Sequence, residues 1–184
     1  GISAGLGDKD ISWCFKYLTN ELRLHEKICG YIYTELQDIE WEHNGFMNYD
    51  RTVKSFGYDY RMINNPDMVL IDAPPGGIVP GGSVVEADIY ISHFSSRVCS
   101  GTKLCWRLDS IDIWGNEREG AVSGATPVSF TPYRVESVHR LAVEMPVGNQ
   151  VCTLHVWIED DAGAVVAQNF ISREIHEGPL PNID

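Results

Sequence analysis

The sequence predicts a mainly β protein, an immunoglobulin-like β-sandwich preceded by a helix, a strand and a loop. Between residues 68 and 175, short runs alternate apolar and polar residues and end at Gly, Pro, Asn or Asp. No helical pattern interrupts them, and about seven such runs over ~110 residues are typical of this fold. A helical pattern and then a β-type run precede them in residues 10–34.

The first predicted element is a helix over residues 10–24, which Asp8 or Asp10 can cap. A strand over residues 30–34 follows, and a loop continues to about Pro66. The helix is predicted from apolar residues that recur at helical spacing, namely Ile11, Cys14, Phe15, Leu18 and Leu22.

The predicted sandwich strands are 68–71, 83–95, 102–114, 122–130, 135–144, 150–158 and 165–175. The alternation changes phase near Ser110, which predicts a β-bulge or a local twist. Residues 73–82 are too rich in Pro and Gly to predict regular structure. The alternation predicts that the inward positions of two strands are Val85, Ala87, Ile89 and Ile91, and Cys152, Leu154, Val156 and Ile158.

Polar turn residues at 64–66 mark a linker between two parts of the chain. We therefore expect one domain over residues 1–65, the sandwich over residues 66–176, and a tail over residues 177–184.

Composition excludes several classes of partner. The net charge is −12 over 184 residues. Binding to nucleic acids or anionic membranes needs clustered Lys and Arg, so neither is expected as a partner. No apolar run approaches the ~18 residues of a membrane span.

The cysteines and histidines give no metal motif. Cys14, Cys29 and Cys152 lie in apolar patterns and are predicted to be buried. Cys99 and Cys105 are predicted to be reduced, with a disulfide across a hairpin as the alternative. The six histidines show no HxH or HExxH spacing, so no metal or other cofactor is expected.

The most informative stretch is 30–54, where a β-type run leads into carboxylates, amides and aromatic rings. Sugar hydroxyls need hydrogen-bonding groups, and sugar C–H faces need a flat apolar ring. The matching positions of a known family are Gly30, Tyr31, Ile32, Tyr33, Thr34 and Asp38, then Asn44-Gly45-Phe46, Tyr49-Asp50-Arg51 and Lys54. The stretch resembles the last barrel strand and following loop of glycoside hydrolase family 2, which includes β-galactosidases, β-glucuronidases and β-mannosidases.

The second half resembles the accessory sandwich that follows the barrel in the same enzymes. The residues that carry this weaker resemblance are Trp106-Arg107-Leu108, Pro146, Asp161-Ala162-Gly163 and Ala167-Gln168-Asn169-Phe170. The two segments that resemble the family follow each other in the same order as in its members.

The resemblance implies that residues 1–65 are the end of a TIM barrel. A complete barrel takes ~250 residues, and the family's two catalytic glutamates lie on earlier strands. We therefore expect the C-terminal part of a putative β-glycosidase, whose parent hydrolyses O-glycosyl bonds of β-linked sugars. The expected partner is carbohydrate in the parent enzyme, and no catalytic residue is expected in this chain.

The predicted substrate-binding residues are Tyr33, Glu35, Gln37, Asp38 and Trp41. Tyr33 falls where family members often carry an aromatic ring at the sugar subsite. Gln37 and Asp38 have an alternative role, that of anchoring the loop through backbone hydrogen bonds. We reject Glu40 and Glu42 as an acid/base pair because neighbours on one loop approach a bond from one side.

The alternative function is a stand-alone carbohydrate- or protein-binding sandwich that uses Trp114 or the Trp41 loop. Trp106 is expected to be the most core-like tryptophan of the sandwich and Trp114 the least. A lone barrel helix and strand also leave apolar faces uncovered. Residues 11–60 are thus expected to fold onto the sandwich, to self-associate with another copy, or to stay poorly ordered.

Overall fold

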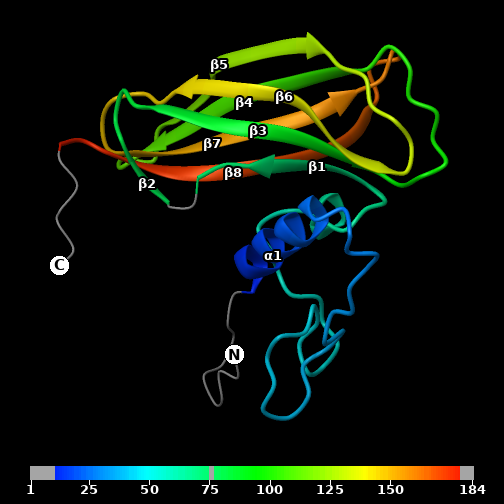
Figure 1. Cartoon of the computed structure of the whole chain (residues 1–184). Helices are drawn as coiled ribbons and strands as arrows, with labels where there is room; N and C mark the ends of the chain where they lie inside the picture. The colour runs from blue at the N-terminus through cyan, green and yellow to red at the C-terminus, as the bar shows by residue number, and fades with distance from the viewer. Residues whose placement is uncertain (1–10, 75–76, 179–184) are drawn as a thin grey trace. The chain divides into compact units, whose positions relative to one another are not determined.

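The structure, a computed structural model, describes residues 11–74 and 77–178. The chain divides between Asn64 and Asn65 into two compact units, which we call unit 1 and unit 2 (Figure 1). The division falls within residues 64–66, the stretch expected to be a linker.

Unit 1 begins with helix α1 (Ser12–Leu24), close to the predicted bounds. The proposed caps Asp8 and Asp10 lie outside the described residues, and the N-cap residue Ile11 makes no side-chain capping bond. A short 3-10 helix, η1 (Tyr60–Met62), lies near the end of the unit.

The strand predicted at residues 30–34 is not present in the structure. Extended backbone becomes a strand only when a neighbouring chain accepts and donates its ladder hydrogen bonds. The described residues place no such neighbour beside this segment, and only isolated bridges form further along the loop, such as Gln37 with Met47.

Aromatic rings provide the core of unit 1. Phe46 lies at the centre, with its ring centroid 4.5 Å from that of Tyr33, 4.9 Å from Phe15, 5.5 Å from Phe56 and 5.4 Å from Tyr60. Tilted and edge-on pairs at such distances are favourable beyond the area that they bury. This aromatic cluster joins α1 to the loop that follows it.

Unit 2 consists of two β-sheets, one with strand order β1-β3-β6 and one with order β2-β8-β7-β4-β5. All pairs are antiparallel except that of β2 with β8. The strands are β1 (Asp67–Asp72), β2 (Ile78–Pro80), β3 (Val84–His93), β4 (Lys103–Asp112), β5 (Glu117–Pro127), β6 (Arg134–Glu144), β7 (Gln150–Glu159) and β8 (Val165–His176).

The apolar residues at alternate positions face each other across the two sheets and form one continuous core. The inward positions predicted for β3 and β7 are confirmed, because each is less than a tenth exposed. Asn169 also lies between the sheets, where its side-chain amide donates to the Val69 carbonyl at 2.8 Å. A buried polar group with such a partner avoids the cost of desolvation.

The seven predicted strands all have a counterpart, and β2 is an addition that the sequence did not predict. It lies in the Pro/Gly-rich segment 73–82, where we expected no regular structure. Three residues pair with β8 at the border of the sheet, and the border position tolerates Pro80, which lacks an N–H.

Two bulges interrupt the outer strands. Between Leu108 and Ser110 the register of β4 with β5 shifts, and the extra residues are on β5. β4 pairs with β7 without a shift, so the change of phase near Ser110 is no bulge of β4 itself and leaves Ile111 on the outer face. Gly120 of the bulged segment has φ +64, and its N–H donates to Asp109 Oδ1 at 2.9 Å. A second shift, opposite the junction of Ile89 and Tyr90, occurs between β3 and β6.

The tryptophans follow the expected order. Trp106 packs against the core, whereas Trp114 is 82% exposed. The Trp106 ring stacks on His139 with the centroids 5.8 Å apart. It also lies directly over Gly124, where an added Cβ would come within 2.2 Å of the ring.

The five cysteines are free, so the expectation of reduced thiols at Cys99 and Cys105 agrees with the structure. Cys152 is buried as predicted, and burial raises the pKa of its thiol to about 11. Cys14 and Cys29 are exposed, which corrects the prediction that they are buried. Cys14 lies on α1 and Cys29 in a segment without strand partners among the described residues, so neither is part of a sheet.

Asp67 organises the start of the sandwich. It accepts hydrogen bonds from His93 Nδ1 at 2.8 Å, from the Phe94 and Ser95 amides, and from Ser95 Oγ at 2.6 Å. Desolvation raises the pKa of Asp67, but the bonds from Ser95 and His93 outweigh it and the net pKa is lowered.

We expect Gly124→Ala to lower the free energy of unfolding of unit 2 by about 1–3 kcal/mol, because its methyl group collides with the Trp106 ring. Urea unfolding followed by circular dichroism measures the change. Gly77→Ala is the matched control, since nothing lies within 4 Å of its added Cβ. Equal stability of Gly124→Ala and the wild type would contradict the packing of Trp106.

The lowered pKa of Asp67 predicts a pH dependence. Its stabilising contribution is present above the unfolded-state pKa of about 3.9 and is lost as the pH falls through the lower folded-state pKa. We therefore expect Asp67→Asn to destabilise the sandwich at pH 7 by about 1–3 kcal/mol. The difference from wild type should shrink below pH 4 in urea titrations, and a pH-independent difference would contradict the assignment.

Candidate functional site

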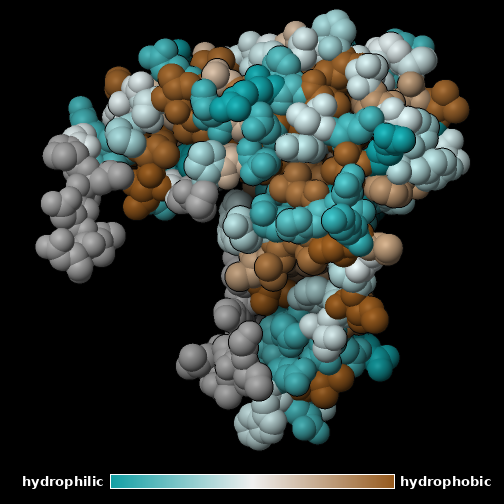
Figure 2. All heavy atoms as spheres, viewed as in Figure 1, coloured by the Kyte–Doolittle hydropathy of each residue, from teal (hydrophilic) through white to brown (hydrophobic). Residues whose placement is uncertain are grey.

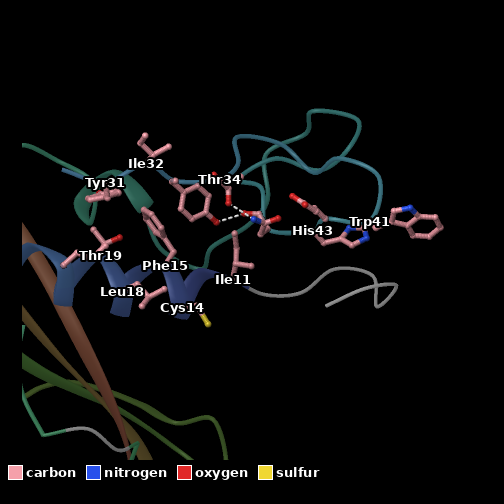
Figure 3. Close-up of a pocket in the computed structure, with 14 residues that line it drawn as sticks. Ile11, Cys14, Phe15, Leu18, Thr19, Tyr31, Ile32, Thr34, Trp41 and His43 are labelled. Carbon is pink, nitrogen blue, oxygen red and sulfur yellow. Dashed lines mark hydrogen bonds between the residues drawn. The ribbon is translucent and has the colours of Figure 1, made fainter. Parts of the chain in front are cut away.

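A hollow of about 610 Å³ lies within unit 1, between α1 and the loop that follows it. Ile11, Phe15 and Leu18 come from the helix side, Ile32 and Thr34 from the facing segment, and Trp41 and His43 from the loop (Figure 3). Its remaining lining residues are Cys14, Thr19, Leu22, Tyr31, Tyr33, Glu42 and Asn44. The hollow thus combines aliphatic, aromatic and polar groups.

Two hydrogen bonds hold the wall of the hollow together. The Tyr33 hydroxyl donates to the Asn44 carbonyl, and the Asn44 side-chain amide donates to the Thr34 carbonyl. The peptide bond from Thr34 to Glu35 is cis. Asn44 therefore ties segment 31–34 to segment 41–44 through both its backbone and its side chain.

The Tyr33 ring is half-buried and packs edge-on against Phe15 of α1, with the centroids 5.4 Å apart. Burial raises the pKa of its phenol, and the negative charges of Asp38, Cys14 and Glu35 raise it further. The hydroxyl is consequently protonated at neutral pH and remains a hydrogen-bond donor.

The Asp38 carboxylate anchors the loop through hydrogen bonds. One carboxylate oxygen accepts from the Gly45 amide at 2.9 Å and from Lys54 Nζ at 2.8 Å, and His43 Nδ1 lies 3.6 Å from the other. Desolvation raises the pKa of Asp38, but the bonds from Lys54 and Gly45 outweigh it and the net pKa is lowered. Asp38 is therefore ionised at neutral pH.

Gly45 is required for this close approach. A Cβ at this position would lie 2.5 Å from the carbonyl carbon of Gln37 and 2.6 Å from the Asp38 nitrogen. Gly45 and Lys54 thus both donate to one carboxylate oxygen of Asp38.

The predicted substrate-binding residues separate into two groups. Tyr33 and Trp41 line the hollow, and Trp41 is 72% exposed at its rim. Glu35, Gln37 and Asp38 do not line it. Asp38 has the loop-anchoring role that the sequence offered as its alternative, and Gln37 bridges to Met47 through its backbone.

Glu35 has one buried carboxylate oxygen without a hydrogen-bond partner among the described residues. The helix residues Cys14 and Leu18 line the hollow, although sequence reasoning assigned them only to the buried face of a helix. The signal that identifies them is their i, i+4 spacing, which puts both on one side of α1.

The acid/base chemistry available in the hollow is limited. Glu42 is its one carboxylate among the described lining residues, and Glu40 does not line it. Retaining glycosidases place two carboxyl groups about 5–5.5 Å apart across the scissile bond. The hollow can therefore bind a ligand through rings and hydrogen bonds, but it does not hold such a pair.

Within residues 11–74 and 77–178, no group of His, Cys, Asp and Glu side chains is arranged to hold a metal ion. None of the helices in this described part is long and apolar enough to cross a membrane.

No protein-family model and no curated protein matches this sequence. Solved structures similar to part of the chain include the CARDB domain of a Pyrococcus furiosus protein in complex with di-metal ions, with 13% identity and a TM-score of 0.39. That match covers 60% of this chain and 87% of the other. A Pseudomonas fluorescens alkylpurine DNA glycosylase bound to DNA has 9% identity and a TM-score of 0.41, covering 60% and 30%.

The sporulation control protein Spo0M of Bacillus subtilis has 10% identity and a TM-score of 0.39, covering 60% of this chain and 49% of the other. Likenesses at this level carry no information about the function of the chain.

We expect Asp38→Asn to loosen the loop, because the amide keeps an acceptor for Gly45 but loses the charge opposite Lys54. Amide hydrogen exchange of residues 37–47 should accelerate by about five- to tenfold, the equivalent of ~1–1.4 kcal/mol. Asp50→Asn is the control, since the exposed Asp50 carboxylate accepts hydrogen bonds within its own turn, from Thr52. Equal exchange rates in the two variants would contradict the role of Asp38 as the anchor.

Proposed function

We propose that unit 1 contributes the rim of a sugar-binding pocket in a family-2-like β-glycosidase. In this proposal the reactive carboxyl groups come from other polypeptide, and the parent enzyme hydrolyses terminal β-linked sugars. The resemblance of residues 30–54 to that family motivates the proposal, and the hollow beside the same residues supports it.

The observation that carries the proposal is the composition of the hollow wall. Tyr33 and Trp41 supply flat rings, while Thr34, Glu42, His43 and Asn44 supply polar atoms within the same wall. A pyranose presents an apolar C–H face and a rim of hydroxyls, and it binds best where rings and hydrogen-bonding groups converge.

Among the described lining residues, Glu42 is the single carboxylate of the hollow, and the reaction of the parent enzyme would need two. Double displacement needs a nucleophile and an acid/base on opposite sides of the glycosidic bond. Under the proposal Glu42 binds a sugar hydroxyl, and the chain by itself has negligible turnover.

We infer that unit 2 is an immunoglobulin-like accessory domain of this enzyme. With β2 set aside, the first, second and fifth strands form one sheet, and the seventh, sixth, third and fourth form the other. This order corresponds to the A-B-E and G-F-C strands of immunoglobulin domains, which supports the assignment.

A second candidate function is a stand-alone binding module. The observation that favours it is Trp114, which is 82% exposed on the turn after β4. An exposed ring on a rigid turn can contact a sugar or a protein without any other domain.

Variants of two exposed tryptophans separate the two candidates. We expect methyl β-galactoside, β-glucuronide or β-mannoside to bind the chain weakly. The affinity should fall at least fivefold in Trp41→Ala and stay unchanged in Trp114→Ala. Removal of a stacking ring typically costs about 1 kcal/mol, which is the equivalent of that factor. Calorimetric titration measures both affinities, and the reverse pattern would favour the stand-alone module.

The same preparation should not hydrolyse 4-nitrophenyl β-glycosides of the three sugars. Tyr49→Ala is the matched control for the binding assay, because Tyr49 is an exposed ring of the same loop that does not line the hollow. Clear turnover by the pure chain would overturn the claim that the reactive acids lie elsewhere.

A further inference from the structure

One row of residues crosses the outer face of the five-stranded sheet. Ile78 of β2 pairs with Glu174 of β8, Glu174 pairs with Val151 of β7, Val151 pairs with Ile111 of β4, and Ile111 pairs with Glu117 of β5. Directly paired residues point to the same side of a sheet. All five are exposed, so the row faces outward, and we call it the outer row.

The outer row leaves aliphatic side chains in solvent. Ile78 is 50% exposed, Ile111 41% and Val151 39%, and they line a groove of about 440 Å³. Ile113, just beyond β4, lines the same groove and is 67% exposed. On the near side of the molecule, which Figure 2 shows, apolar residues are likewise interspersed among polar ones. An apolar patch built from three strands of one sheet is typical of an interaction surface.

Carboxylates lie on both sides of Val151 and Ile111 in the outer row. Glu174 and Glu117 are three strands apart, which corresponds to about 14 Å between their backbones. Neither forms an ion pair within the described residues. The described lining of the groove contains no Lys or Arg, while Asp112 adds a third carboxylate.

The turn next to the groove is rigid. Asp112 accepts from the Trp114 amide at 2.8 Å and from the Asn116 amide and side chain, both at 2.9 Å. These bonds fix the segment that presents Ile113. The groove is therefore a preformed surface, and a partner would not have to order it.

We propose that the outer row is the docking surface for a basic amphipathic segment of a partner protein. Lys or Arg side chains of the segment would pair with Glu174 and Glu117, and its apolar face would cover Ile78, Val151 and Ile111. A separation of about 14 Å equals roughly two and a half turns of helix, so one helix laid across the strands reaches both carboxylates.

The negative charge of the outer row favours a basic segment over a second copy of the chain or an anionic membrane. A second copy docking through the same face would bring its own acidic row against Glu174 and Glu117, which is unfavourable in a symmetric contact. An anionic membrane surface is repelled for the same reason. The net charge of −12 also steers a cationic segment toward the chain.

The test uses the full chain and a fluorescein-labelled 18-residue peptide of Lys, Leu and Ala whose sequence places all leucines on one helix face. Fluorescence anisotropy should give a micromolar Kd. We expect Ile111→Ser to weaken binding about tenfold, and Glu174→Gln about two- to fivefold, as for exposed ion pairs. Circular dichroism establishes that both variants are folded.

Two controls separate docking from general attraction to an acidic protein. Glu144→Gln removes the same charge from β6, in the other sheet, and should leave the Kd unchanged. A peptide of the same composition in scrambled order, without an apolar face, should bind at least tenfold more weakly.

Three results would overturn the proposal. They are equal weakening by Glu144→Gln and Glu174→Gln, equal affinity for the ordered and scrambled peptides, and no binding of the ordered peptide at 100-fold the expected Kd. Analytical ultracentrifugation adds a further test. A dimer that Ile111→Ser converts to monomer would assign the row to a second copy and overturn the proposal as well.

Discussion

The structure of unit 2 depends on one constraint, the period of two along a β-strand. Once Cys152, Leu154 and Val156 are buried between the sheets, their neighbours on β7 must point outward. The same constraint acts on every strand that pairs with β7. Hydrophobic burial thus selects the register, and the register decides which side chains meet on the outer face. The core and the outer row are two results of a single pattern.

Unit 1 follows a different principle. Its described residues form no sheet, and its loop is held by a few polar contacts around Asp38 and by rings around Phe46. The buried carboxylate is stable because Gly45 and Lys54 both donate to it. The rings and the carboxylate together fix the segment that carries Tyr33, Asn44 and Trp41. The shape of the hollow therefore depends in part on Asp38, Phe46 and Lys54, which do not line it.

Strand positions in unit 2 could be predicted from the sequence because alternating burial is local information. β2 could not, since it contains Pro80 within a Pro/Gly-rich segment and its pairing with β8 depends on a partner about a hundred residues away in the chain. The opposite error occurred at residues 30–34, where strand-forming residues lack a neighbouring strand.

The lining of the hollow was likewise predicted in part from the sequence and in part not. The loop side was predicted from its unusual mixture of rings and polar groups, which needs no knowledge of the fold. The α1 side was not, because the exposure of Cys14 and Leu18 depends on where the loop lies. Asp38 was assigned two alternative roles for a related reason: a carboxylate that binds a ligand and one that binds backbone amides have the same local sequence.

The bulges in β5 and β6 have a consequence for association between chains. Each of these strands is one of the two borders of its sheet, and each is kinked by a register shift, with Gly120 in a left-handed conformation on β5. A kinked border cannot serve as a template on which another strand is added in continuous register. Growth of a fibril from the β5 or β6 border is therefore disfavoured.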